Sequence, residues 1–313
     1  MENGKAASRI DWSEGRWREM LVQQRKFLWS AETTERYARW MGLRQGMTVV
    51  DVGCGLGFLG YTYWPHFGKG GTYIGIDQSE KLIAEAREAA RVWATDGAAE
   101  FLVGDCYDLP FGDKSTDCVM CQTLLMHLDK PRKALEEMYR VLRPGGLMLC
   151  KEPDNLSGIL ARQYFSAADF SNEDYLLSAK VQLAIHDGRM KLGRGDQSIG
   201  SRVPHMIREM GMVDVDVTMK EAVFFLEPPY ETEKQRHEFE QLKKMYSDLV
   251  DRDFWRTKYR EEFLAGGGEP DDYERYCATM DRYFEAALKQ MDKREFSSCG
   301  GYLTFITKAR KPA

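Results

Sequence analysis

Short apolar runs rich in β-branched residues alternate with longer amphipathic runs between residues 47 and 151. The short runs predict buried strands, and the longer ones, with apolar residues at helical spacing, predict helices. The expected strands cover 47–52, 72–77, 99–105, 117–122 and 147–152, and the clearest helices cover 79–94 and 130–142. Strand and helix in regular succession imply an α/β fold with a doubly wound, mostly parallel sheet, which binds ligands beyond the carboxyl ends of its strands.

The regular alternation of strand and helix patterns ends after residue 152. Residues 155–199 are mostly helical in pattern and run into a glycine-bearing loop at 187–202, a stretch too long for an ordinary connection. Residues 203–228 resume the order of helix then strand, 229–297 are charged and helical, and 301–311 form a final strand pattern. We therefore expect an interrupted core with helical cap insertions. The expected division is 1–46 as an N-terminal helical segment, 47–154, 200–228 and 300–313 as core, and 155–199 and 229–299 as insertions.

Composition narrows the class of protein. With 313 residues, 43% of them hydrophobic, the chain can bury a large core. A net charge of −5 gives no general attraction for a phosphate backbone, so we expect no nucleic-acid partner. Seven scattered cysteines do not form the framework of a secreted disulfide domain, and no apolar run reaches membrane-spanning or signal-peptide length. These features predict a cytoplasmic protein without a membrane partner.

Residues 51–60, DVGCGLGFLG, place glycines where a ligand approaches the backbone closely. Gly55-x-Gly57-x-x-Gly60 fits the dinucleotide fingerprint, so a nicotinamide or flavin enzyme is one interpretation. Asp51 argues for another. A carboxylate at the end of this strand would repel a pyrophosphate but suits an ammonium and a sulfonium, the groups that S-adenosylmethionine carries.

Polar residues end the next three strands where this ligand needs them. Asp77 can accept both ribose hydroxyls, although a dinucleotide would use it in the same way. Asp105 can accept from the adenine amino group, with the N–H of Cys106 facing a ring nitrogen. Gln122 and Thr123 would face the methionyl part and the transferring methyl.

In order and spacing, DVGCGLG, GIDQS, GDCYDLPF, DCVMCQTLLMHL and RVLRPGG resemble the class I S-adenosylmethionine-dependent methyltransferases over residues 47–152. The resemblance implies a seven-stranded sheet whose seventh strand is antiparallel, with 1–46 closing over the cofactor site. By position it also implies the cofactor-binding set of Asp51, Gly53, Cys54, Gly55, Gly57, Asp77, Gln78, Asp105, Cys106, Gln122 and Thr123. Trp64-Pro65 departs from the pattern, because the proline must kink or end the helix after the glycine loop.

Several residues near this site allow two interpretations. His127 follows the fourth strand and is a candidate general base or a packing residue. Glu152, with Asp154, is a candidate for binding or deprotonating the acceptor or a solvated loop carboxylate. Cys118-x-x-Cys121 has zinc-ligand spacing, but residues three apart on a strand point to opposite faces, so we expect buried structural cysteines and no metal.

The N-terminal aromatics and the charged segment 229–297 are less specific. The aromatics are core-packing residues, of which one or two contact the cofactor; they are Trp12, Trp17, Phe27, Trp29, Tyr37 and Trp40. The segment 229–297 carries both signs of charge, which indicates solvated helices or, alternatively, a homodimer interface.

The expected function is methyl transfer from S-adenosylmethionine to a small-molecule acceptor by in-line displacement. Aromatic residues in the two insertions suggest an apolar or ring-bearing acceptor. The alternatives are a protein or nucleic-acid methyltransferase of the same fold, a nicotinamide-dependent oxidoreductase, and a cofactor-binding protein without turnover. Residues 121–124 read Cys-Gln-Thr-Leu and lack the Asn-Pro-Pro-Tyr pattern of many methyltransferases that act on bases and peptides.

Overall fold

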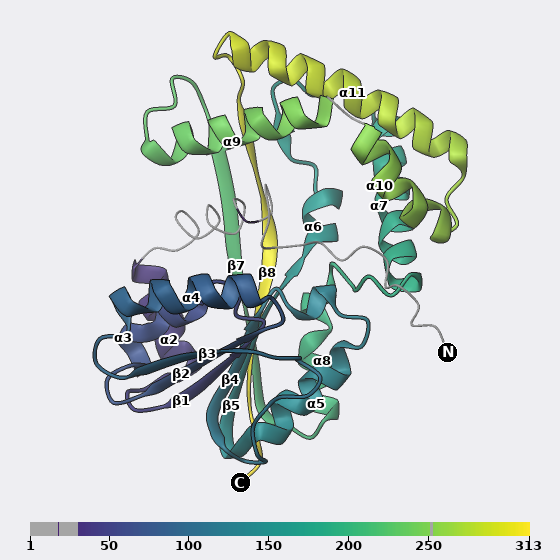
Figure 1. Cartoon of the computed structure of the whole chain (residues 1–313). Helices are drawn as coiled ribbons and strands as arrows, with labels where there is room; N and C mark the ends of the chain where they lie inside the picture. The colour runs from purple at the N-terminus through teal and green to yellow at the C-terminus, as the bar shows by residue number, and fades with distance from the viewer. Residues whose placement is uncertain (1–17, 19–30, 251–252) are drawn as a thin grey trace.

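The structure is a computed structural model that describes residue 18 and residues 31–250 and 253–313. A twisted sheet forms its centre, and a separate helical layer stands beyond one end of the sheet (Figure 1). The strands are β1 Thr48–Val52, β2 Thr72–Asp77, β3 Ala98–Val103, β4 Thr116–Gln122, β5 Leu142–Asp154, β6 Tyr164–Phe165, β7 Val213–Leu226 and β8 Ser298–Arg310. The longer helices are α2 Ala31–Met41, α3 Phe58–Phe67, α4 Glu80–Trp93, α5 Pro131–Val141, α7 Asn172–Lys191, α9 Glu233–Val250, α10 Asp253–Ala265 and α11 Pro270–Asp292. The shorter ones are α6 Asn155–Leu160, α8 Val203–Glu209 and the 3₁₀ turns η1 Leu125–His127 and η2 Ile199–Ser201.

The sheet has the order β3-β2-β1-β4-β5-β8, with β7 and the short β6 both pairing with β8. Strands β1 to β5 pair in parallel, whereas β8 is antiparallel to β5 and to β7. The doubly wound, mostly parallel sheet is therefore confirmed, with β6 as an addition to the seven expected strands. The chain winds outward from β1 to one side and then from β4 to the other, so the switch point of the topology lies between β1 and β4.

The two faces of the sheet carry separate apolar clusters, because side chains alternate along each strand. One face packs against α2, α3 and α4, and the other packs against α5 and α8. Cys118 belongs to the first cluster and Cys121 to the second, so the two thiols point to opposite faces. Within the described residues, no group of His, Cys, Asp or Glu is arranged to hold a metal ion.

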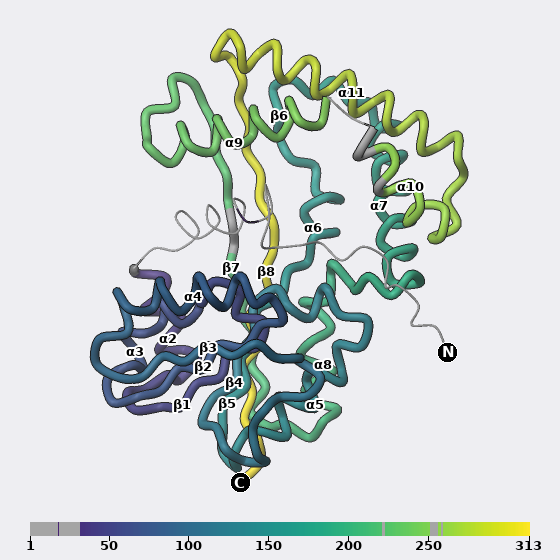
Figure 2. The backbone as a smooth tube through the Cα atoms, in the orientation of Figure 1, coloured from purple at the N-terminus to yellow at the C-terminus, as the bar shows by residue number. Residues whose placement is uncertain are grey.

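Strands β7 and β8 continue past the sheet as a long antiparallel ribbon that carries the helical layer (Figure 2). This layer, here called the cap, consists of 155–202 and 229–297. It has apolar clusters of its own, one around α9 and α11 and one joining α7, α10 and α11. Among the described helices, none is long and apolar enough to cross a membrane.

One local expectation was wrong. Helix α7 continues to Lys191, through Gly188 and the start of the expected loop at 187–202. Gly188 is there because α10 packs against it: a Cβ would lie 1.6 Å from the carbonyl oxygen of Glu262. Helix α3 includes Pro65 and ends at Phe67, so the helix ends soon after the proline, one of the two effects expected of Trp64-Pro65.

Candidate active site

The loop from β1 to α3 carries three glycines with positive φ angles at Gly53, Gly55 and Gly57 (71°, 54° and 76°). L-residues with side chains rarely adopt this left-handed conformation. Space is short as well: a Cβ on Gly53 would lie 2.8 Å from Leu124 Cδ1, and one on Gly57 would lie 2.8 Å from Phe101 Cε1. The glycines therefore let the loop pass tightly beneath the start of α3, whose free N–H groups favour an anionic ligand group.

Asp77 connects the end of β2 to this loop. Its Oδ2 accepts a hydrogen bond from the N–H of Gly55 at 3.0 Å, and its Oδ1 accepts from the N–H of Ser79 at 2.9 Å. Burial raises the pKa of this carboxyl, and the backbone N–H bonds oppose that rise. The carboxylate thus stands at the carboxyl end of β2, beside the glycine loop.

Asp51 is 2% exposed, and its Oδ2 accepts a hydrogen bond of 2.6 Å from the hydroxyl of Tyr73. Tyr73 is itself fully buried, and its pKa is raised well above the usual value by burial and then by the carboxylate of Asp51. Asp51 is therefore a buried acceptor beneath the glycine loop. The sequence pattern did not reveal Tyr73, which lies on the neighbouring strand.

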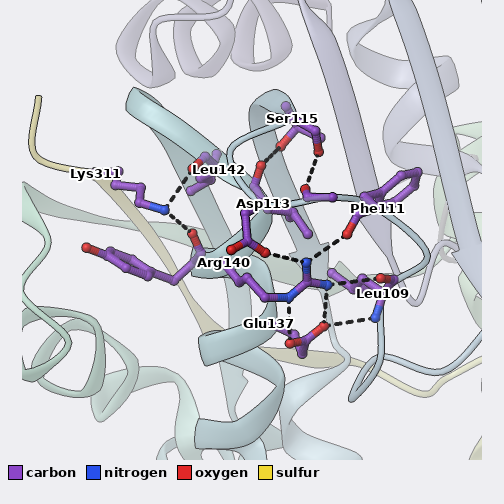
Figure 3. A network of polar contacts seen from close by, with 12 residues as sticks. Leu109, Phe111, Asp113, Ser115, Glu137, Arg140, Leu142 and Lys311 are labelled. Atoms are coloured by element: carbon purple, nitrogen blue, oxygen red, sulfur yellow. Dashed lines mark hydrogen bonds and ion pairs between the residues drawn. The ribbon is translucent and has the colours of Figure 1, made fainter.

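The loop after β3 carries Asp105, which is exposed, and Cys106, which is half-buried. Arg140 of α5 anchors this loop by donating to the carbonyl oxygens of Phe111 and Leu109 at 2.7 and 3.0 Å (Figure 3). Glu137 completes the network, since it accepts from Arg140 and from the N–H of Leu109. The two residues expected at the adenine thus lie on a segment fixed from α5.

At the end of β4, Gln122 is half-buried and its Oε1 accepts a hydrogen bond from Lys151 Nζ at 3.1 Å. Thr123 is exposed and has a φ of 50°, an unusual value for a β-branched residue. The chain therefore turns sharply beyond β4, directly opposite the glycine loop. Sequence reasoning missed Lys151, although a lysine in the apolar run LMLCKE was a visible signal.

Glu152 is 1% exposed and directs its carboxylate at the first N–H groups of the η1 turn. The oxygens accept from the N–H groups of Leu124, Leu125 and Met126 at 2.9, 3.0 and 3.2 Å. Burial raises the pKa of Glu152 to about 7, and these backbone bonds oppose the rise. The carboxylate thus fixes the turn that follows β4.

His127 ends the same turn and lies under the loop 192–202. A Cβ on Gly195 would lie 2.2 Å from the Met126 carbonyl oxygen and 2.9 Å from His127 Cα, so the loop packs directly on the turn. Burial, and then the charge of Arg189, lowers the pKa of His127 to about 4. The imidazole is therefore neutral at neutral pH and is a weak base.

The remaining expected contacts are distributed as follows. Asp154 caps α6 by accepting from the N–H of Ser157 at 3.2 Å. Trp40 donates to Asp216 at 3.0 Å, away from the glycine loop. Tyr37 is buried in α2, whereas four of the aromatics lie outside the described residues: Trp12, Trp17, Phe27 and Trp29.

Comparisons with known proteins show which proteins this chain is similar to. Residues 50–150 match a family model described as a methyltransferase domain. An uncharacterised methyltransferase of Schizosaccharomyces pombe is 34% identical over 152 residues, 47% of this chain and 52% of that protein. The demethylmenaquinone methyltransferase of Staphylococcus aureus is 36% identical over 118 residues, 38% of this chain and 48% of the enzyme. The chain thus spans about half the length of these curated relatives.

Solved structures share the fold. YcgJ from Bacillus subtilis gives a TM-score of 0.51 at 16% identity, covering 91% of this chain and 100% of that one. Phosphoethanolamine N-methyltransferase 2 of Haemonchus contortus, in complex with S-adenosyl-L-methionine, gives 0.51 at 15% identity, covering 96% of this chain and 59% of that one. Residues 50–150 therefore resemble a methyltransferase domain, and the chain shares the fold of these solved structures.

Proposed function

We propose that this protein transfers a methyl group from S-adenosylmethionine to a small-molecule acceptor. The observation that carries the proposal is the left-handed glycine loop at the switch point of the sheet, held by Asp77 at the end of the next strand. Ligands of doubly wound sheets bind at this point. The residues present fit the cofactor. The bare backbone of the glycine loop and the N-terminus of α3 suit its methionine carboxylate, and the carboxylate of Asp77 suits its ribose.

In this proposal the methionine part lies along Gly53, Cys54, Gly55 and Gly57, with Asp51 buried beneath them. Asp77 and Gln78 hold the ribose, and Asp105 and Cys106 hold the adenine. Gln122 and Thr123 border the methyl group. The sharp turn at Thr123, fixed by Glu152 through the η1 turn, sets the wall opposite the glycine loop.

Bound S-adenosylmethionine would supply an electrophilic methyl group on a good leaving group. What remains for the chain is to hold the acceptor in line and to exclude water, a positioning effect of about 7–11 kcal/mol. The carboxylate of Glu152 already accepts hydrogen bonds from backbone N–H groups, and His127 is a weak base. We therefore propose that both shape the site and that neither deprotonates the acceptor.

The acceptor class rests on the relatives and on the cap. The demethylmenaquinone methyltransferase carries a small-molecule substrate in its name, which supports a small acceptor here. The cap insertions are the natural place for acceptor recognition, since function on shared folds lies in added elements. A homodimer through 229–297 stays a prediction.

Calorimetric titration with S-adenosylmethionine and, separately, with a nicotinamide dinucleotide tests the cofactor assignment. We expect binding of the first alone. Binding of the dinucleotide instead would overturn the proposal and would indicate that the glycine loop binds a pyrophosphate. A radiolabelled-methyl screen of small acceptors, with peptides and nucleic acids as comparison substrates, then tests the acceptor class.

A further inference from the structure

Two lysines are buried on the face of the sheet that packs against α2 and α3. Lys151 of β5 is 9% exposed, and Lys220 of β7 is 8% exposed. Both strands flank β8, in which Ile306 pairs with Lys151 and Thr304 pairs with Lys220. Because Ile306 and Thr304 are two residues apart, both lysines project from the same face, at the level where β4 ends.

The two ammonium groups influence one another. Burial, and then the charge of Lys220, holds the pKa of Lys151 well below its ordinary value. Burial lowers the pKa of Lys220 to about 8. Buried lysines are rare, and here the carboxylate of Glu152 opposes the fall in the pKa of Lys151 and so favours its charged form.

The surroundings connect this pair to the proposed reaction centre. Lys151 Nζ donates to Gln122 at 3.1 Å, and Gln122 borders the proposed methyl position. Tyr63 of α3 is 3% exposed and lines the same ≈ 20 Å³ cavity as Lys151. Tyr37 lies close enough to raise the pKa of Tyr63, after burial as the main cause. Lys151 and Tyr63 thus line one small cavity, while the hydroxyl of Tyr37 donates to the carbonyl oxygen of Met219 on β7 at 3.2 Å.

We propose that Lys151 and Lys220 form an anion-binding subsite that holds an acidic group of the methyl acceptor, a carboxylate or an ionised hydroxyl, beside Gln122. The inference rests on the proposed function. The methionine carboxylate of the cofactor is the competing anion, since Leu59 near the start of α3 lines the same cavity as Lys151. The affinity of the lysine variants for S-adenosylhomocysteine distinguishes the two anions. Charge-assisted hydrogen bonds from the two lysines would therefore favour acidic acceptors over their neutral analogues.

The test compares an anionic with a neutral probe of the same shape. Benzoate and benzamide are titrated calorimetrically into the protein, with and without S-adenosylhomocysteine. We expect benzoate to bind at least about tenfold more tightly than benzamide, as charge-assisted hydrogen bonds imply. Lys220→Met and Lys151→Met should each abolish that preference, Lys220→Arg should retain it, and Lys289→Met, on the exposed face of α11, should leave it unchanged.

The outcomes separate this inference from the proposed function. Equal affinity for the two probes, no benzoate binding, or an unchanged preference in both methionine variants overturns the subsite. Loss of S-adenosylhomocysteine affinity in the methionine variants overturns it as well, because the lysines would then serve the cofactor. Failure of the wild-type protein to bind S-adenosylhomocysteine contradicts the proposed function. The preference for benzoate over benzamide can still be measured in the absence of S-adenosylhomocysteine. Thermal melts and circular dichroism show that each variant is folded.

Discussion

Asp77 has two tasks in the proposed site, because it fixes the glycine loop through Gly55 and faces the ribose. Asp77→Ala removes both. Hydrogen bonds to a charged group contribute about 1.5–3 kcal/mol each, so we expect at least about a tenfold loss of affinity for S-adenosylmethionine. Calorimetry measures the loss. Asp96→Ala, an exposed carboxylate remote from the loop, is the matched control, and an unchanged dissociation constant for Asp77→Ala would refute the assignment.

The lowered pKa of Lys220 predicts how the free energy of unfolding changes with pH. Its pKa is lowered from 10.5 to about 8 by burial, so the unfolded chain binds more protons than the folded one between these values. The contribution of Lys220 to the free energy of unfolding is therefore unfavourable below pH 8 and becomes less so as the pH rises toward 10.5. The shift corresponds to roughly 3 kcal/mol as an upper bound.

Lys220→Met removes this penalty. We expect the variant to be more stable than the wild type at pH 7, with the difference shrinking between pH 8 and pH 10.5. Denaturant unfolding of both proteins across this range measures it. Other lysines and tyrosines titrate in the same window in both proteins, so the difference between the curves carries the result. A difference that stays constant with pH would contradict the prediction.

Residues that act through their own backbone position could be predicted from the sequence, and residues that act through a neighbouring strand could not. The glycines and Asp77 follow from spacing, since a tight loop and a strand end each leave a local pattern. Tyr73 and Lys220 leave none. Their partners become neighbours only when β2 pairs with β1, and when β8 inserts between β5 and β7.

At the scale of elements, helix α5 controls the loop that follows β3. Arg140→Met removes the donors to Leu109 and Phe111 and leaves Glu137 with fewer partners. Because Arg140 is partly exposed, we expect a modest loss, about 1–2 kcal/mol in the free energy of unfolding. Affinity for adenosine and for S-adenosylmethionine should fall together by severalfold.

Hydrogen exchange of residues 104–115, with calorimetry, measures both effects. Exchange in this segment should accelerate in Arg140→Met. Arg143→Met is the control, because Arg143 pairs with Asp117 of β4 at 2.6 Å. If the loop exchanges at the wild-type rate in Arg140→Met, the anchoring role is wrong.

The boundaries of most elements between residues 47 and 141 were predicted within one or two residues, because β1, β2 and β4 are short runs. Strand β5 begins at Leu142, five residues before its expected start. Another exception comes from a contact between helices. Glycines usually interrupt helices, so Gly188 predicted a loop, yet it is the point where α7 meets α10. Gly266 has the same role from the other side, where a Cβ would lie 1.8 Å from the carbonyl oxygen of Ala184.

At the scale of the whole molecule, the cap and the sheet have separate apolar cores linked by the β7–β8 ribbon (Figure 1). The glycine loop and Asp77 belong to the sheet, whereas the proposed acceptor-recognition elements belong to the cap. Cofactor binding should therefore depend on the core of the sheet, and turnover should depend on both.

Phe263 in the cap and Phe67 under the sheet provide a matched pair, since both are fully buried. Truncation of either to alanine removes the same side chain and should lower local stability by about 3–5 kcal/mol. For Phe263→Ala we expect faster hydrogen exchange in α7, α10 and α11, near wild-type affinity for S-adenosylmethionine, and a large loss of methyl transfer. For Phe67→Ala we expect weaker cofactor binding. If Phe263→Ala weakens cofactor binding as much as Phe67→Ala does, the two cores act as one unit and the division of labour is wrong.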